Sequence, residues 1–110
     1  MEWVYIKDLK NYVGKDVELK GWVRRKRSSG KISFIEMRDG SGFVQVVVEK
    51  STVGDENFAQ ADKLRLEASF IVRGKVRTDE RAPSGVELLA SEVIPVQIPS
   101  EDFPIQKPDH

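Results

Sequence analysis

The fold is decided by residues 16–49, which read DVELKGWVRRKRSSGKISFIEMRDGSGFVQVVVE. Apolar and polar residues alternate in three segments of this stretch, 16–25, 31–39 and 43–48. Two turn signals separate the segments, Ser28-Ser29-Gly30 and Asp39-Gly40-Ser41-Gly42. Because alternation with a period of two is typical of half-buried strands, the stretch is expected to form three consecutive strands joined by hairpins.

The regions on either side complete a small all-β domain. Alternation returns at residues 67–77 and 86–93 and predicts two more strands, while the pattern of residues 56–64 predicts an internal helix of about two turns. Residues 5–14 are expected to form a helical turn that ends at Gly14. The order of three strands, a helix and two strands is that of the OB-fold, a five-stranded Greek-key barrel with its helix between strands three and four. An SH3-like barrel competes, but it has no place for that helix.

Glycines inside two of the predicted strands favour a barrel as well. Gly21 and Gly74 each interrupt an alternating segment. A small barrel has to coil its strands sharply, and glycine allows the close backbone approach that coiling needs.

Composition excludes several classes of function. The chain has 110 residues, 18 basic and 18 acidic, with no cysteine and one histidine, His110. Zinc ribbons, disulfide frameworks and thiol nucleophiles are therefore excluded, and no metal site or cofactor is expected. No segment has the length and apolarity of a transmembrane helix, and the N-terminus lacks a signal pattern, so a cytoplasmic location without membrane contact is expected.

The chain is expected to contain one domain and a tail. Four of the five prolines fall at or after position 95. Because such a density of proline stops regular structure, residues 1–97 are expected to form the OB-fold domain and residues 98–110 an extended linker.

The neutral chain carries a local cationic stripe. Residues 20–31 contain six basic side chains and no acidic one. Such a stripe attracts polyanions over about 10 Å despite the zero net charge. We expect Arg24, Arg25, Lys26 and Arg27 to form a mobile cationic loop before the turn at Gly30, and these side chains, with Lys31, to contact phosphates. The alternative is a solvated hairpin.

Two outward side chains have the chemistry to bind an unpaired base. If Val44 and Val46 line the core, Gln45 points outward, and Phe34 points away from its apolar neighbours Ile35 and Met37. A ring stacks on a base, and an amide both donates and accepts hydrogen bonds along the base edge. The alternative is that Phe34 only packs beneath the N-terminal segment or Trp22.

Glu87 is expected on the same outward face, because it alternates with Val86 and Leu88. A carboxylate on a phosphate-binding surface is electrostatically unfavourable. Its presence there is explained if it accepts a hydrogen bond from the amino group of a base. The alternative is an ion pair with Arg73 or Lys75. No nucleophile–base pair, phosphate-binding loop or metal-binding loop is recognisable in the sequence, so no catalytic residue is assigned.

The ordered set of residues from Gly21 to Val46 resembles the anticodon-binding domain of class IIb aminoacyl-tRNA synthetases, the asparaginyl, aspartyl and lysyl enzymes. The residues that carry this resemblance are GWVRRKRSSGKISFIEMRD at 21–39 and GFVQV at 42–46. Two further stretches are most similar to the asparaginyl branch, ERAPSGVE at 80–87 and DFPIQK at 102–107. Pro108 departs from the basic residue usual in that branch.

The resemblance implies roles by position. By this resemblance, Phe34 stacks on the central anticodon base, a uridine, and Gln45 forms a hydrogen bond with that base. Arg27 contacts the anticodon loop, and Glu87 lies near the first anticodon base. The resemblance also implies tRNA and the catalytic domain of a parent synthetase as partners, homodimerisation through that domain, and ATP and Mg²⁺ only there. The 110-residue chain would then bind tRNA without aminoacylating it.

Four functions remain open from the sequence. The first is recognition of the tRNA-Asn anticodon for an asparagine–tRNA ligase, and the second is the same task in an aspartate–tRNA ligase. The third is an OB protein that binds single strands without sequence preference. The fourth is an OB domain that makes protein contacts only.

Overall fold

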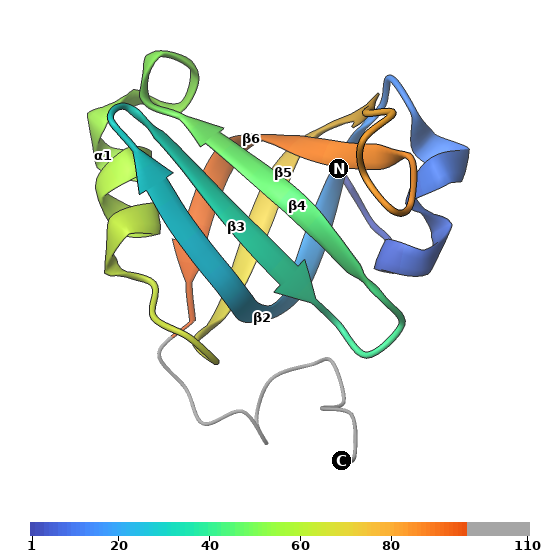
Figure 1. Cartoon of the computed structure of the whole chain (residues 1–110), viewed down its shortest axis with the longest axis horizontal. Coiled ribbons are helices and arrows are strands. Elements are labelled where there is room, and N and C mark those ends of the chain that lie inside the picture. Colours follow the sequence, from blue (N-terminus) through green and yellow to red (C-terminus); the bar gives the residue numbers. More distant parts are fainter. Residues whose placement is uncertain (97–110) are drawn as a thin grey trace.

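A computed structural model of the 110-residue chain describes residues 1–96. The elements are, in chain order, β1 (Glu2–Trp3), the 3₁₀ helix η1 (Ile6–Tyr12), β2 (Asp16–Ser29), β3 (Ile32–Arg38), β4 (Phe43–Glu49), α1 (Lys50–Lys63), β5 (Ser69–Thr78) and β6 (Val86–Pro95). Figure 1 shows β2, β3 and β4 as one side of the molecule, with α1 at one end and η1 at the other. The predicted linker, residues 98–110, lies outside the described residues.

The strands close into a barrel with the predicted topology. They are hydrogen-bonded in the order β1-β2-β3-β4-β6-β5, and β2 also pairs with β5, which closes the ring. The β2–β3, β3–β4 and β5–β6 pairs are antiparallel, whereas β4 and β6 pair in parallel over two residues. Helix α1 lies between the third and fourth of the five barrel strands, as expected for an OB-fold. The OB-fold prediction is confirmed, and the SH3-like alternative is wrong.

The two interior glycines sit where the backbone of a neighbouring strand passes close by. A Cβ atom at Gly21 would lie 2.2 Å from the main-chain oxygen of Arg38, and one at Gly74 would lie 2.2 Å from that of Leu89. Both distances are far inside van der Waals contact, so a side chain at either position would require the neighbouring backbone to shift. The prediction of close backbone approach at Gly21 and Gly74 is confirmed.

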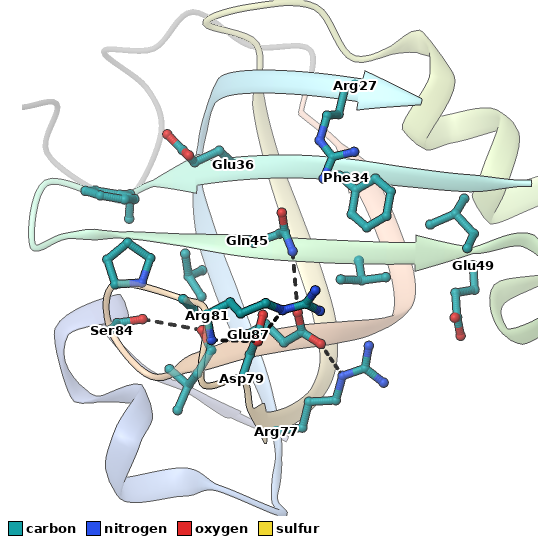
Figure 2. A pocket seen from close by; sticks show the side chains of 17 residues that line it. Arg27, Phe34, Glu36, Gln45, Glu49, Arg77, Asp79, Arg81, Ser84 and Glu87 are labelled. Atoms are coloured by element: carbon teal, nitrogen blue, oxygen red, sulfur yellow. Dashed lines mark hydrogen bonds and ion pairs between the residues drawn. The ribbon is translucent and has the colours of Figure 1, made fainter. Parts of the chain in front are cut away.

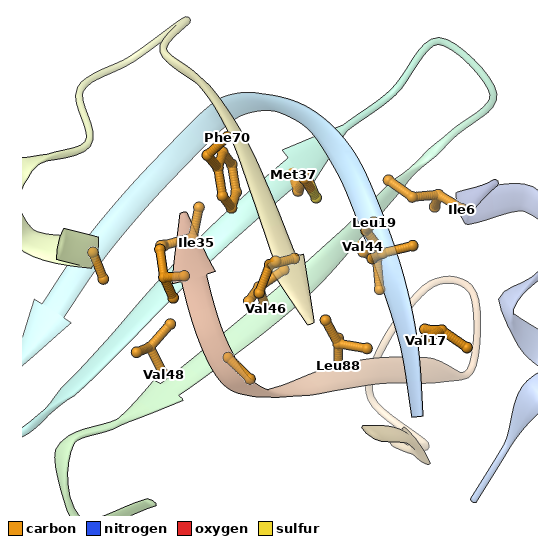
Figure 3. Close-up of a cluster of buried hydrophobic side chains, with 14 of the residues drawn as sticks. Ile6, Val17, Leu19, Ile35, Met37, Val44, Val46, Val48, Phe70 and Leu88 are labelled. Carbon is orange, nitrogen blue, oxygen red and sulfur yellow. The ribbon is translucent and has the colours of Figure 1, made fainter. Parts of the chain in front are cut away.

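Alternation separates the core from the outer face of the sheet. Inward residues of β3 and β4, among them Ile35, Met37, Val44 and Val46, are buried, and they pack against inward residues of β2, β5 and β6 (Figure 3). Helix α1 adds Phe58 and Ala61 to this cluster. Burying an aliphatic side chain of this size stabilises the folded state by about 1.5–3 kcal/mol. Because the apolar side chains of a strand therefore face inward, the residues that alternate with them face outward.

The other strand boundaries agree with the expectation to within two residues, and the main differences lie in β2, α1 and β1. Strand β2 continues through the four cations to Ser29, so the expected mobile cationic loop is wrong, because the cations extend the β2–β3 hairpin. The helix begins at Lys50 rather than Glu56, because one turn precedes a break at Gly54, whose φ is 86°. The short strand β1, which pairs in parallel with β2, has too few residues to show a periodic pattern.

Candidate nucleic-acid interface

A β-bulge in β2 sets which cations face the outer side. The register with β3 shifts between Val23 and Arg25, so that Arg25 lies opposite Glu36 and Arg27 opposite Phe34. Residues directly opposite each other share a face of an antiparallel pair. Arg24, within the bulge, bonds Glu36 with its Nη1 atom at 2.6 Å. The bulge therefore brings Arg24, Arg25 and Arg27 to one face, although strict alternation would divide them.

Phe34 faces outward, under an arginine. It lies on β3 opposite Val47 and is half-buried, and the guanidinium carbon of Arg27 lies 4.1 Å from its ring centroid. Trp22, in contrast, packs against Ile71 and Val96. The side chain of Phe34 lines an open groove and lies outside the main core cluster, which argues against the alternative in which it only packs.

Gln45 belongs to a chain of polar contacts with two charged residues. Its Nε2 donates to Oε1 of Glu87 over 3.4 Å, and Nε of Arg77 donates to Oε2 of the same carboxylate (Figure 2). Glu87 is 8% exposed, so its charge is held by these two partners. The expected alternative partners are wrong: Lys75 lies opposite Leu89, and Arg73 bonds Glu18 and Glu92.

One groove of about 550 Å³ on the outer face of β3 and β4 is lined by five of these side chains, Arg27, Phe34, Gln45, Arg77 and Glu87. The connection between β5 and β6 forms its far wall with Asp79, Arg81 and Ser84, as Figure 2 shows. A second depression of about 420 Å³ shares Phe34 and Gln45 and extends across β2 to Leu66. Phe34 and Gln45 therefore lie where the two depressions meet.

The predicted phosphate contact at Lys26 needs correction. Lys26 lies opposite Ile35, and its Nζ donates to the main-chain oxygens of Ala61, Asp62 and Leu64 at 2.8, 2.8 and 2.9 Å. Partial burial is the main cause that lowers the pKa of its ammonium group. Because the three hydrogens of the ammonium group are used at the C-terminal end of α1, Lys26 is poorly placed for a phosphate.

The remaining cations of the predicted stripe differ in position. Arg25 and Lys31 are exposed, which leaves them accessible to solvent anions. The Nζ of Lys20 lies 4.3 Å from the ring centroid of Trp3 and 3.7 Å from Oε2 of Glu18, and Lys20 lines neither depression. Within the stripe, the three arginines and Lys26 line the second depression, and Arg27 also lines the groove. Lys20 and Lys26 in addition make contacts within the fold.

Phe43 and Arg77 are among the groove residues that sequence reasoning missed. Phe43 is 41% exposed, and it lies two residues before Gln45 on the same face of β4. The period of two that placed Gln45 outward was the signal that could have identified it. Arg77 carried no comparable signal, because its pairing with Glu87 depends on the register of β5 and β6.

Two further classes of site are absent from residues 1–96. No cluster of three or more His, Cys, Asp or Glu side chains in this part of the chain is arranged to hold a metal ion. In the same residues, no helix has the length and apolarity needed to cross a membrane.

The barrel and its groove define an OB-fold domain with a surface of the kind that binds nucleic acids: aromatic, amide and arginine side chains face solvent on the strands. The chain belongs to the tRNA anticodon family of OB-fold nucleic acid binding domains, whose family model matches residues 17–96. The resemblance in the sequence to the asparaginyl-tRNA synthetase branch is confirmed by the relatives described next.

Curated relatives include the asparagine–tRNA ligase of Symbiobacterium thermophilum, 46% identical over 110 residues, which cover all of this chain and 25% of that protein. The asparagine–tRNA ligase of Thermus thermophilus is 40% identical over 107 residues, 97% of this chain and 24% of that protein. The crystal structure of asparaginyl-tRNA synthetase from Pyrococcus horikoshii superimposes with a TM-score of 0.81 at 44% identity, covering 96% of this chain and 25% of that one. This chain spans about a quarter of the length of the curated relatives it matches.

Proposed function

We propose that this chain binds the anticodon loop of tRNA-Asn and serves as the anticodon-recognition part of an asparagine–tRNA ligase. The observation that carries the proposal is the placement of Phe34, Gln45 and Arg27 together in one open groove of an OB-fold domain. The similarity to asparagine–tRNA ligases supports the choice of tRNA over other single strands and of asparagine over aspartate.

The ring of Phe34 offers a stacking surface for one unpaired base. The guanidinium of Arg27 lies over the ring in the unliganded protein, and a base can occupy the same face once that side chain moves to a phosphate. Stacking of a base on an aromatic side chain contributes about 1–3 kcal/mol. The base on Phe34 is proposed to be the central one of the anticodon.

Gln45 has the geometry to select uracil for that position. One hydrogen of its Nε2 is directed to Glu87, which fixes the amide orientation and leaves Oε1 as an acceptor. Uracil offers an N3–H donor beside a carbonyl oxygen, and the amide oxygen and the second Nε2 hydrogen complement that pair. Cytosine offers the reversed pattern, and turning the amide to match it would place Oε1 against the carboxylate of Glu87.

Phosphates of the loop are proposed to contact the exposed cations of the β2–β3 hairpin, with Arg25, Arg27 and Lys31 as the main candidates. For single strands, the logarithm of the binding constant falls with the logarithm of the salt concentration, with a slope of about −0.7 for each neutralised phosphate. Glu87 is proposed to act near the first anticodon base as well as on Gln45.

The proposal is tested with the 110-residue chain and labelled anticodon stem-loops by fluorescence anisotropy at low salt. A loop with the anticodon GUU is expected to bind about 5- to 150-fold more tightly than the loop GCU, because one bidentate base contact discriminates by about 1–3 kcal/mol. Equal affinities for the two loops would favour binding without sequence preference. Failure to bind any loop at low salt would favour a role in protein contacts only.

Two further comparisons sharpen the test. The loops GUU and GUC differ only in the third anticodon base, and a preference for GUU separates the asparagine from the aspartate assignment. Phe34→Ala is expected to weaken binding by about 1–3 kcal/mol with little change in stability. A large loss of stability in that variant would instead place the ring in a structural role.

A further inference from the structure

A second aromatic ring in the groove repeats the arrangement found at Phe34. Phe43 is 41% exposed, and the guanidinium carbon of Arg24 lies 4.6 Å from its ring centroid. At the first ring the corresponding distance, from Arg27, is 4.1 Å. Both arginines come from β2 and both rings from the outer face of the β3–β4 pair. The structure thus carries the same pairing of a planar ring with a cation twice.

The two rings are too far apart to hold the same base. Phe34 lies opposite Val47, whereas Phe43 lies opposite Arg38, which is four residues further along β3. At a strand rise of about 3.4 Å per residue this corresponds to roughly 14 Å. Both rings line the groove, with Gln45 between them on β4. A strand that passes over Phe34 and Gln45 therefore reaches Phe43 with a different nucleotide.

The surroundings of Phe43 hold its backbone firmly and supply further cations. Asp39 is 3% exposed, and its carboxylate accepts hydrogen bonds from the main-chain nitrogens of Ile6 and Ser41, both at 2.8 Å, which order the turn before Phe43. Beyond the ring, a depression of about 450 Å³ continues toward η1, and its lining includes Lys7 and Lys10. An ordered, exposed ring flanked by cations matches the surfaces on which single strands stack.

We propose that Phe43 is a second stacking platform, which holds an unpaired base of the bound RNA other than the one on Phe34, with Lys10 beside the adjoining phosphate. This inference rests on the proposed function, because it needs a single strand in the groove. Arg24 is proposed to leave the ring when the base arrives, as Arg27 does at Phe34.

The test uses the GUU stem-loop and a matched pair of variants. Phe43→Ala is expected to weaken binding roughly 5- to 150-fold. Trp3→Ala is the control, because Trp3 is 37% exposed and has Lys20 4.3 Å from its ring centroid, yet neither residue lines the groove or the depressions beside it. This variant is expected to leave the affinity unchanged. Phe43→Trp is expected to retain binding, whereas Phe43→Leu, which keeps an apolar side chain without a planar face, is expected to lose it.

Stem-loops with one abasic nucleotide identify the base on each ring. The effect of Phe43→Ala is expected to vanish when one particular loop base outside the central anticodon position is removed, and that of Phe34→Ala when the central base is removed. All variants are compared at a temperature where circular dichroism shows them folded.

The outcomes separate this inference from the proposed function. If Phe34→Ala weakens binding and couples to the central base while Phe43→Ala or Phe43→Leu binds like the unchanged chain, the second platform is refuted and the proposed function stands. If Phe43→Ala couples to the central base instead, one base spans both rings and the inference is also overturned. If neither loop sequence nor Phe34→Ala changes the affinity, the proposed function itself fails.

Discussion

Replacing Lys26 by methionine tests how the cationic hairpin is held to the barrel. Methionine keeps most of the aliphatic stem and removes an ammonium group that donates to three main-chain oxygens at the end of α1, at 2.8, 2.8 and 2.9 Å. One hydrogen bond of a charged donor contributes about 1.5–3 kcal/mol where it is buried, and terminal helix carbonyls can be hydrated instead. Because one of the three bonds is exposed, we expect the variant to lose about 2–3 kcal/mol in total.

Urea unfolding and thermal melting, followed by circular dichroism, measure this loss. A decrease of 2–3 kcal/mol corresponds to about 8–12 °C in Tm for a domain of this size. Lys31→Met is the matched control, because Lys31 is exposed on the same hairpin, and it is expected to stay within about 0.5 kcal/mol of the unchanged chain. Equal stability of the two variants would refute the capping role of Lys26.

The same two variants separate structural from phosphate-binding cations. In stem-loop titrations over a range of salt, Lys31→Met is expected to reduce the slope of log K against log salt by about 0.7, the value for one phosphate of a single strand. Lys26→Met is expected to leave the slope unchanged, because its ammonium group is already bound by the protein. A reduced slope in Lys26→Met alone would reverse the assignment of the two lysines.

Three further predictions concern other parts of the barrel. Gly74→Ala is expected to cost about 3 kcal/mol or more in urea unfolding, since the added Cβ would lie 2.2 Å from the main-chain oxygen of Leu89; a neutral result would contradict the close approach of β5 and β6. Asp39→Ala removes the acceptor of three hydrogen bonds of 2.6–2.8 Å and is expected to cost about 2–4 kcal/mol in the same assay. The carboxylate of Glu2 is the main cause that raises the pKa of Tyr12, so Glu2→Gln is expected to lower that pKa toward 10.0 in an NMR titration. Because the folded chain holds the Tyr12 proton more tightly, stability is expected to fall as pH rises through that pKa, and less so in Glu2→Gln.

The period of two was sufficient to place the central site residues. Ile35 and Met37 carry inward apolar side chains, so Phe34 had to face outward, and the buried valines of β4 placed Gln45 in the same way. This inference needed no knowledge of strand order, because burial of one face determines the other. The OB-fold class was predicted from the order of three strands, a helix and two strands, which likewise required no knowledge of strand pairing.

Contacts that depend on strand register could not be predicted from the alternation of apolar and polar residues. The sequence pattern offered Arg73 or Lys75 as a partner for Glu87 and gave no signal for Arg77, although the three residues alternate along β5. In the folded chain the β5–β6 register shifts at Gly74, and Arg77 comes to lie opposite Glu87. A bulge of this kind changes pairing without changing the apolar pattern that sequence reasoning uses.

The bulge in β2 shows how one irregularity separates scaffold from binding surface. The part of β2 before the bulge, up to Trp22, pairs with β5 and closes the barrel, and the part after it pairs with β3 alone. The segment of four consecutive cations contains no apolar residue that would indicate the change of register at the bulge. The sequence therefore could not predict which of the four side chains face the outer side of the sheet. Because of the shift, Arg25 and Arg27 share the outer face with Arg24 and line the second depression. Lys26 lies opposite the buried Ile35, and its ammonium group donates to the end of α1. The charge run therefore supplies both the ligand-facing cations and the anchor that keeps their strand in place.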